Sequence, residues 1–343
     1  MHRATSKSWL RPSASREKTV TTTEIVTDQA RAKRRNYSFL FALTLVGILL
    51  LLWAILSFAT PIFMTERNIS NLLRQGSMIA ILAMGETFVI ITAGIDLSVG
   101  AISAFSTVVI AESLQSGVPV WGAVVITLAI GLVIGLFHGF GITKMGLPPF
   151  IITLATLTSL RGVGLLITNG ATISITDKGF TEFAVRDFFG IPSLFWMVLL
   201  VAAPSYVLLS HTRWGRYIFA VGSNPEAARL SGVRINLVIY VAYSFSAVLA
   251  AFVGVLLATR IGIGNATQAT GWELQAIASS VIGGTSLFGA IGSVHGPLIG
   301  AFILATINNG ANLLNVNSFW QQIITGGLII IIVYFDGLRR RRV

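Results

Sequence analysis

The sequence contains no cysteine and few charged residues. Among its 343 residues, 24 are Lys or Arg and 13 are Asp or Glu, so 11% are charged, whereas a soluble domain carries about 25%. The absence of cysteine excludes disulfides, thiolate metal sites and cysteine nucleophiles. Because 54% of the residues are hydrophobic, a soluble core of this size could not bury them. The composition therefore predicts an all-α integral membrane protein and excludes an ordinary cytosolic enzyme.

Several catalytic and binding motifs are also absent. There is no Gly-Lys dipeptide, which excludes a P-loop and with it an ATPase of the Walker type. The four histidines (His2, His138, His211 and His295) show no metal-ligand spacing, and no Gly-x-Ser-x-Gly elbow occurs. A regular series of acidic residues, expected of many ion-coupled carriers, is missing as well. We therefore expect no catalytic residue, metal or cofactor in this chain.

Apolar segments of about 20 residues are what a helix needs to cross a bilayer, and ten such segments can be placed along the chain. The last three divide a stretch from residue 274 to 335 that has no formal charge. The predicted spans are 38–58, 71–93, 98–114, 119–140, 149–168, 193–211, 235–259, 274–291, 296–313 and 318–336.

The net charge of +11 is concentrated at the two ends of the chain. Residues 1–35 hold nine Lys or Arg against three acids, and the tail contains Arg339 to Arg342. With ten spans both termini lie on one side, and 18 of the 24 Lys and Arg fall on that side. Cytoplasmic loops are rich in Lys and Arg, so both termini are predicted to be cytoplasmic. A basic surface on a folded domain, as nucleic-acid binding requires, is not indicated.

Three regions follow from this arrangement. Residues 1–37 are predicted to be a basic, disordered cytoplasmic segment. Residues 38–336 form the membrane domain, which includes a long cytoplasmic loop over residues 212–234, and residues 337–343 form a basic cytoplasmic tail.

A helix start is encoded in the long cytoplasmic loop. Asn224 is a good N-cap, Pro225 suits the first helical position and Glu226 favours the positive end of the helix dipole. Arg229 follows in the last turn and Gly232 can end the helix. The pattern predicts a short helix outside the bilayer, which is either a solvated connector or a docking helix for a cytoplasmic partner.

Two glycine-rich stretches interrupt the apolar segments. In Gly94 to Gly100, the glycines are predicted to permit a tight reversal within the membrane. Asp96 or Ser98 is predicted to cap the next helix, with direct contact to a solute as the alternative. The second stretch, residues 282–296, allows close helix packing or a segment that enters the membrane and turns back. At an offset of 189 residues the two stretches share four identities, which hints at a structural repeat. The glycines that define this motif are Gly94, Gly100, Gly283, Gly284, Gly289 and Gly292.

Isolated polar residues lie within the predicted spans. Glu86 and Arg161 are charges near mid-span, so each is expected to find a partner or to face water. Either they pair with each other, or they line a solute path. A polar and aromatic group near the outer end of the last two spans suits a neutral polyhydroxylated solute or, alternatively, interfacial anchoring and helix packing. Its members are Asn308, Asn309, Asn312, Trp320 and Gln321.

At these residues the sequence resembles the ribose-type permease subunits of bacterial ABC importers, within the wider group that includes branched-chain amino-acid permeases. The matching stretches run from about residue 70 to residue 336. They are Gly85 to Ile90, Gly94 to Gly100, Pro149 to Leu154, Ala220 to Gly232, Gly283 to Gly296, Asn308 to Leu314 and Phe319 to Gln321. Two features depart from the family: Glu86 stands where Met or Gln is usual, and an Ile-x-Leu-Pro continuation after Gly232 is missing.

The resemblance implies a multi-pass permease of the bacterial cytoplasmic (inner) membrane that translocates a sugar or related polyol. It implies a cytoplasmic ATP-binding subunit, which carries ATP and Mg²⁺, an extracytoplasmic solute-binding protein, and a second permease subunit, identical or related. Coupling to the ATPase falls on residues that match the family's Glu-Ala-Ala signature and its flanks. They are Asn224, Pro225, Glu226, Ala227, Ala228, Arg229 and Gly232.

Other functions stay open on the sequence. An ion-coupled secondary transporter would use Glu86 or Asp96 as its coupling site, and a permease of the same class could carry an amino acid or another non-sugar solute. A third class is a membrane enzyme or scaffold, for which the sequence contains no recognisable site.

Overall fold

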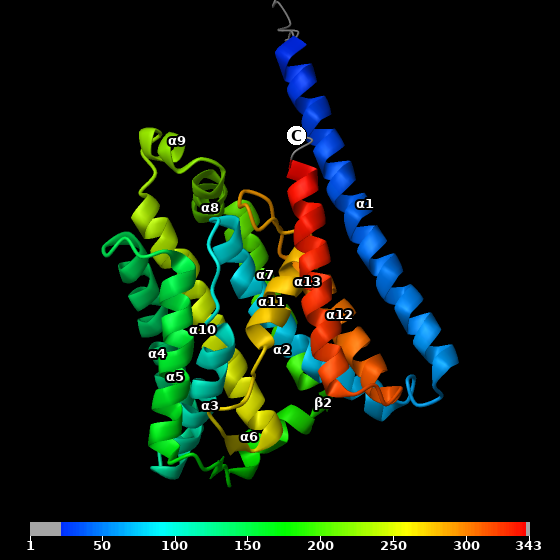
Figure 1. Cartoon of the computed structure of the whole chain (residues 1–343), viewed down its shortest axis with the longest axis vertical. Coiled ribbons are helices and arrows are strands. Elements are labelled where there is room, and N and C mark those ends of the chain that lie inside the picture. Colours follow the sequence, from blue (N-terminus) through cyan, green and yellow to red (C-terminus); the bar gives the residue numbers. More distant parts are fainter. Residues whose placement is uncertain (1–21, 341–343) are drawn as a thin grey trace, which may run out of the picture. The chain divides into compact units, whose positions relative to one another are not determined.

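The computed structural model describes residues 22–340. The chain divides into two units, Met1–Leu43 and Thr44–Val343. The described part of the first unit is the start of helix α1, and all other elements belong to the second unit (Figure 1).

Thirteen α-helices and four two-residue strands make up the regular structure of the described residues. The helices are α1 (Thr22–Ala59), α2 (Glu66–Ile91), α3 (Val99–Gln115), α4 (Val120–Thr143), α5 (Pro149–Thr168), α6 (Lys178–Val185), α7 (Ser193–His211), α8 (Arg213–Ser223), α9 (Pro225–Leu230), α10 (Ile235–Ile261), α11 (Trp272–Ile282), α12 (His295–Leu313) and α13 (Ser318–Arg340). The strands are β1 (Ile173–Ser174), β2 (Asp187–Phe188), β3 (Ile191–Pro192) and β4 (Ile263–Gly264).

A helix occurs at each of the ten predicted spans, but among the described residues only six segments are both long and apolar enough to cross a membrane. They are Leu40–Ala59 of α1, α2, α4, α5, α7 and α10. Helix α3 is apolar but has only 17 residues, and α11 has 11. The all-helical, multi-pass character is confirmed, whereas the count of ten spans stays a prediction.

The predicted span 274–291 is wrong in extent. Helix α11 ends at Ile282, and residues 283–294 form an irregular loop. Gly284 and Gly289 have φ angles of +88° and +84°, which glycine adopts readily and which end helical geometry. A glycine-rich loop of apolar composition has the same hydropathy as a membrane helix, so composition alone could not separate them.

Helix α1 begins at Thr22, inside the segment 1–37 that the sequence predicts to be disordered. Residues 22–37 contain Ala, Gln, Glu, Lys and Arg but neither Gly nor Pro, so the helix can extend back into them. Residues 1–21 and 341–343 lie outside the described residues, and the predicted tail is helical as far as Arg340.

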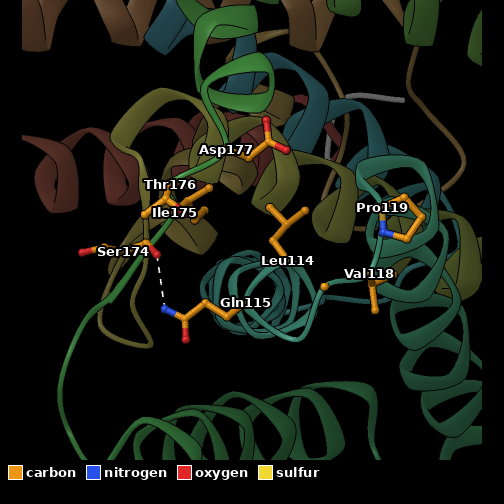
Figure 2. Close-up of a pocket in the computed structure, with 9 residues that line it drawn as sticks. Leu114, Gln115, Val118, Pro119, Ser174, Ile175, Thr176 and Asp177 are labelled. Carbon is orange, nitrogen blue, oxygen red and sulfur yellow. Dashed lines mark hydrogen bonds between the residues drawn. The ribbon is translucent and has the colours of Figure 1, made fainter.

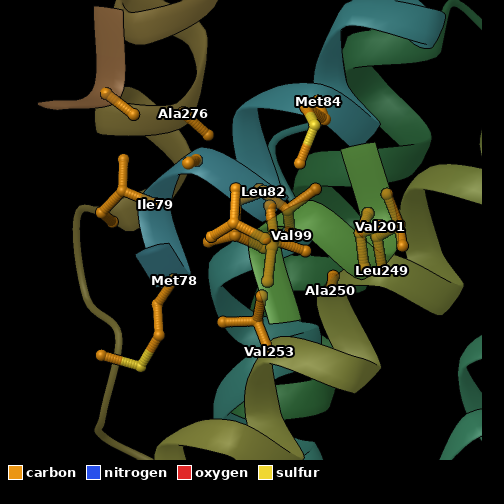
Figure 3. Packing of buried hydrophobic residues seen from close by; sticks show 14 of the residues in the cluster. Met78, Ile79, Leu82, Met84, Val99, Val201, Leu249, Ala250, Val253 and Ala276 are labelled. Carbon is orange, nitrogen blue, oxygen red and sulfur yellow. The ribbon is translucent and has the colours of Figure 1, made fainter. Parts of the chain in front are cut away.

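Helices α2 and α10 form the interior of the second unit. The most apolar stretch is 89% buried in α2 and 72% buried in α10, against 22% in α4 and in α5. Figure 3 shows Leu82 of α2 next to Val99 of α3, in the same buried cluster as Met78 of α2 and Leu249 of α10. A helix that buries its apolar residues needs no lipid, whereas the exposed apolar faces of α4 and α5 require a hydrophobic solvent. Helices α4 and α5 are therefore among the helices that face the bilayer.

The contact of α4 with α10 depends on three glycines spaced four residues apart. Cβ atoms at Gly131 and Gly135 would lie 2.9 Å and 2.8 Å from the carbonyl oxygens of Ala247 and Tyr243, and Gly139 faces the Tyr240 ring. This spacing places them on one face of the helix, where the absent side chains let two backbones approach closely.

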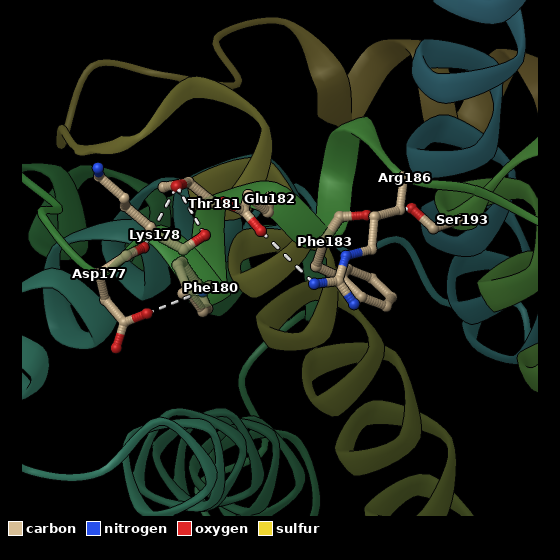
Figure 4. Close-up of polar contacts among 8 residues, drawn as sticks. All are labelled: Asp177, Lys178, Phe180, Thr181, Glu182, Phe183, Arg186 and Ser193. Carbon is tan, nitrogen blue, oxygen red and sulfur yellow. Dashed lines mark hydrogen bonds and ion pairs between the residues drawn. The ribbon is translucent and has the colours of Figure 1, made fainter.

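One end of the second unit carries α6 and the two short antiparallel ladders. Strand β1 pairs with β4, and β2 pairs with β3. Figure 4 shows Asp177 capping α6 by accepting the Phe180 N–H at 2.9 Å, and Glu182 paired with Arg186 at 3.5 Å. Arg74 of α2 fastens this region with an ion pair of 3.1 Å to Asp187.

Candidate functional site

Helices α8 and α9 meet at a single residue, Asn224. Its N–H donates to the Ala220 carbonyl at 3.1 Å and closes α8, and its side-chain oxygen accepts the Ala227 N–H at 3.0 Å and opens α9. Pro225 follows at the first helical position, where its missing N–H has no intrahelical partner to lose. The predicted short helix is confirmed, with no connecting loop between it and α8.

Helix α9 exposes both polar and apolar side chains on its surface. Glu226 and Arg229 form an ion pair of 2.8 Å, but their side chains are 71% and 67% exposed, so it adds little stability. Ala228 is buried, whereas Leu230 is 86% exposed. The helix ends at Gly232, whose φ is +82°. An exposed, well-capped helix with a projecting leucine is suited to contact another protein.

A cavity of about 150 Å³ lies between α8 and the start of α10, and Gly232 is the one predicted site residue among those that line it. Aromatic rings and one cation line it, together with glycine and aliphatic side chains. The lining residues are Trp214, Tyr217, Gly232, Arg234, Leu237 and Val238.

The stretch from Gly94 to Gly100 forms the predicted reversal between α2 and α3. Ser98 occupies the N-cap of α3 without accepting a hydrogen bond; instead Asp96 accepts both the N–H and the hydroxyl of Ser98. The residue with positive φ is Ala93, at 62°, not one of the glycines. The expectation that the glycines provide the turn is therefore wrong. Gly94 is required because the Tyr243 hydroxyl packs against it, and Gly100 because Glu273 and the Ala269 carbonyl do.

Glu86 is completely buried and bonds to this turn. One carboxylate oxygen accepts the Asp96 N–H at 3.0 Å, and the other makes no hydrogen bond within the described part of the chain. Asp96 also accepts from the Ser246 hydroxyl of α10 at 3.3 Å. Hydrogen bonds of Glu86, Asp96 and Ser98 thus connect α2, the turn and α10. Ser246 takes part in this network, although no sequence motif singled it out.

Arg161 does not pair with Glu86, so the hypothesis of a direct ion pair is wrong. One guanidinium nitrogen donates to the carbonyls of Ala266 and Gln268 at 3.2 Å and 3.4 Å. Its other terminal nitrogen is buried without a hydrogen bond to any residue that the structure describes. A partner on the loop between β4 and α11 could not be foreseen, because a backbone carbonyl gives no sequence signal.

The glycine-rich loop 283–294 contacts three helices. The Ala290 N–H donates to the Ile91 carbonyl of α2 at 2.9 Å. Asp336 of α13 accepts from the Ser286 hydroxyl at 2.9 Å and from the Leu287 N–H at 3.1 Å. A Cβ atom on Gly289 would lie 2.8 Å from the Gly222 carbonyl of α8. Asp336 was missed because it stands at the end of a predicted span.

The hint of a repeat at an offset of 189 residues stays a prediction. Gly100 lies within α3, whereas its counterpart Gly289 lies in a turn with φ of +84°. Gly283 packs against the backbone of Gly296, a contact that its counterpart Gly94 does not make.

The polar group near the last two helices does not form a single cluster. Asn309 exchanges hydrogen bonds of 2.8 Å and 3.1 Å with Asn68 of α2, and Gln321 donates to Asn312 at 2.7 Å. Trp320 is 61% exposed and Asn308 is half-buried. Asn68 lies far away in the sequence and was not foreseen.

A second cavity, of about 260 Å³, lies at the α6 end of the unit, away from all predicted site residues. Figure 2 shows Gln115 of α3 donating to the Ser174 carbonyl at 3.3 Å on its wall. The other lining residues are Leu114, Gly117, Val118, Pro119, Ile175, Thr176 and Asp177.

Known proteins resemble this chain over most of its length. Residues 68–333 match the family described as branched-chain amino acid transport system / permease component. The ribose import permease protein of Escherichia coli K12 is 40% identical over 299 residues, which cover 85% of this chain and 92% of that protein. The ribose import permease protein of Bacillus subtilis 168 is 40% identical over 315 residues, covering 90% of this chain and 98% of that protein.

A relative named for another solute is similar to the same extent. The D-allose transport system permease protein of Escherichia coli K12 is 38% identical over 293 residues, covering 85% of this chain and 90% of that protein. No solved structure is detectably similar to this chain. The chain belongs to the branched-chain amino acid transport system / permease component family.

Proposed function

We propose that this chain is the membrane-spanning permease subunit of an ATP-binding cassette importer for a sugar. Its family membership and its 40% identity to ribose import permeases over 85–90% of the chain support this function. The relatives named for D-allose and for galactose and methyl galactoside favour a monosaccharide as the solute class.

The energy source in this proposal is a separate cytoplasmic subunit that binds ATP and Mg²⁺. The observation that carries this step is α9: it is capped by Asn224, exposes Leu230 and projects from the unit. The coupling residues are those from Asn224 to Arg229, with Gly232 at the end of the helix.

The α6 end then faces outward and receives a solute-binding protein. The surface available there is polar and structured: α6 is capped by Asp177, and the Arg74–Asp187 ion pair fixes it to α2. Ten membrane segments, cytoplasmic termini and a second permease subunit complete the assembly. The positive-inside distribution of Lys and Arg supports this orientation.

The solute path in this proposal includes Arg161 rather than Glu86, Asp96 and Ser98. The latter three are completely buried and bonded to the α2–α3 turn. Arg161 keeps a terminal nitrogen without a hydrogen-bond partner in the described chain, and a guanidinium can donate to sugar hydroxyls. Arg161→Gln should therefore raise the KM for uptake with little change in the maximal rate. An unchanged KM would remove Arg161 from the path.

The burial of Glu86 and Asp96 also argues against ion-coupled transport, because a coupling ion must reach its site from water. Reconstitution in liposomes separates the two functions. Uptake of a labelled monosaccharide should require ATP, the ATPase subunit and the binding protein together. Uptake driven by an ion gradient through this chain alone would contradict the proposal, and uptake of branched-chain amino acids instead of sugars would change the solute class.

A further inference from the structure

Gly222, the penultimate residue of α8, packs directly against two other backbone segments. A Cβ atom at this position would overlap the carbonyl oxygen of Ile91, the last residue of α2, and would lie 2.9 Å from the Ala290 nitrogen. The Ala290 N–H in turn donates to that same Ile91 carbonyl at 2.9 Å. Any side chain at residue 222 would therefore force the three segments apart.

Gly289 closes the contact from the opposite side. Its φ of +84° favours glycine, and a Cβ atom there would lie 2.8 Å from the Gly222 carbonyl and 3.1 Å from the Ile91 carbonyl. We call the meeting of Gly222, Ile91, Gly289 and Ala290 the backbone junction. It joins the ends of α8 and α2 to the loop between α11 and α12 without any intervening side chain.

The backbone junction is connected to α9 by a short stretch of chain without a loop. Asn224 ends α8 and begins α9, so only Ser223 and Asn224 separate Gly222 from the first residue of α9. A displacement of α9 must therefore move Gly222. Close-packed backbone has low compressibility, so the movement would pass to Ile91 and Ala290 instead of being absorbed by side-chain rearrangement.

Two structural units lie beyond the junction. Ile91 ends α2, the most buried of the six candidate membrane helices. Ala290 lies on the loop that carries α11 and α12, and these helices pack through Gly283 against Gly296 and through Gly300 against Ser279. Ser280 of α11 also donates to the Ala83 carbonyl of α2 at 2.9 Å. Movement at the junction therefore reaches the interior of the membrane domain by two connected routes.

We propose that the backbone junction is where movement of α9, driven by the ATPase subunit, enters the membrane helices. Gly222 and Gly289 are the positioning residues of this step, and the proposal rests on the proposed function. They act through backbone geometry and touch neither solute nor nucleotide.

The experiment uses the complete complex of permease, ATPase subunit and binding protein in liposomes. Gly222→Ala and Gly289→Ala should each lower ATP-driven uptake by about tenfold while the ATPase subunit still co-purifies with the permease. Gly162→Ala is the matched control, because a Cβ atom at Gly162 meets nothing within 4 Å. Uptake by either junction variant within about twofold of wild type, less than typical coupling effects, would overturn the proposal.

A second measurement on the wild-type complex does not depend on the folding of a variant. Hydrogen exchange at the Ala290 amide should change between the nucleotide-free and ATP-bound states, because this N–H donates to Ile91 across the junction. Identical protection in both states would overturn the proposal. If the wild-type complex shows no ATP-driven uptake at all, the proposed function fails instead.

Discussion

At the scale of single residues, many glycines of this chain lie where another part of the fold packs closely against the backbone and leaves no room for a side chain. Gly94 and Gly100 lie on either side of the α2–α3 turn, yet the positive φ belongs to Ala93. The Tyr243 hydroxyl occupies the space that a side chain at Gly94 would need, and Glu273 does the same at Gly100. A small residue at such a site lets a partner from a distant helix approach the backbone, so Gly94 and Gly100 serve packing and not the backbone conformation of the turn.

A double-mutant cycle tests this reading of Gly94. Gly94→Ala should lower the free energy of unfolding by about 1–3 kcal/mol, because the added methyl overlaps the Tyr243 hydroxyl. In a Tyr243→Phe background the same change should cost less, since the hydroxyl is gone. Thermal unfolding of the purified protein in detergent measures both. The control Gly47→Ala adds a methyl into open space; equal costs of Gly94→Ala in the two backgrounds would refute the assignment.

At the scale of elements, α6 and α9 are two short capped helices at opposite ends of α7. Asp177 caps α6 and Asn224 caps α9, and each helix carries one exposed Glu–Arg pair. Because their local construction is so similar, the two helices provide a matched comparison. Their expected partners differ only because α9 is proposed to lie on the cytoplasmic side of the membrane and α6 on the outer side.

Charge reversal in these helices should therefore have different effects on transport. Glu226→Lys in α9 should uncouple ATP hydrolysis from uptake, because it reverses a charge on the surface that we propose contacts the ATPase. Glu182→Lys in α6 breaks a pair that is also more than half exposed and should leave the coupling ratio unchanged. The ratio of solute taken up to ATP hydrolysed in liposomes is the measurement. The same ratio for Glu226→Lys and wild type would argue against docking at α9.

At the scale of the whole molecule, burial separates interior helices from those that face lipid. The apolar stretch of Leu40–Ala59 is 11% buried and that of α7 is 33% buried, whereas α2 is 89% buried. Within the second unit, α7 runs from β3 to the start of α8, and its 19 residues give a rise of about 28 Å. This length matches the hydrocarbon thickness of a bilayer, so we expect the β2–β3 turn and α9 to lie on opposite sides of the membrane.

Cysteine labelling tests this orientation, because the native chain has no cysteine to react. Phe189→Cys and Leu230→Cys replace residues that are 96% and 86% exposed. A membrane-impermeant maleimide should label Phe189→Cys in intact cells and Leu230→Cys only after the membrane is opened. The wild-type chain should stay unlabelled throughout. Labelling of both positions from the same side would contradict the topology.

Features that depend on local pattern and composition can be predicted from the sequence. Low charge and long apolar segments predict membrane helices, and Asn-Pro-Glu followed by Gly predicts α9 with its cap and end. These signals work because helix capping involves neighbours within about four residues, and hydropathy reflects the solvent rather than the partner.

Contacts between residues that are distant in the sequence become apparent only in the tertiary structure. Glu86 and Arg161 look like natural partners in the sequence, yet each bonds to backbone atoms elsewhere. The loop 283–294 has the hydropathy of a helix, but its glycines form turns against α2, α8 and α13. Backbone carbonyls and close packing are the partners in all these cases. Every residue has a backbone carbonyl, so the sequence does not show which carbonyl will accept a hydrogen bond from a distant side chain.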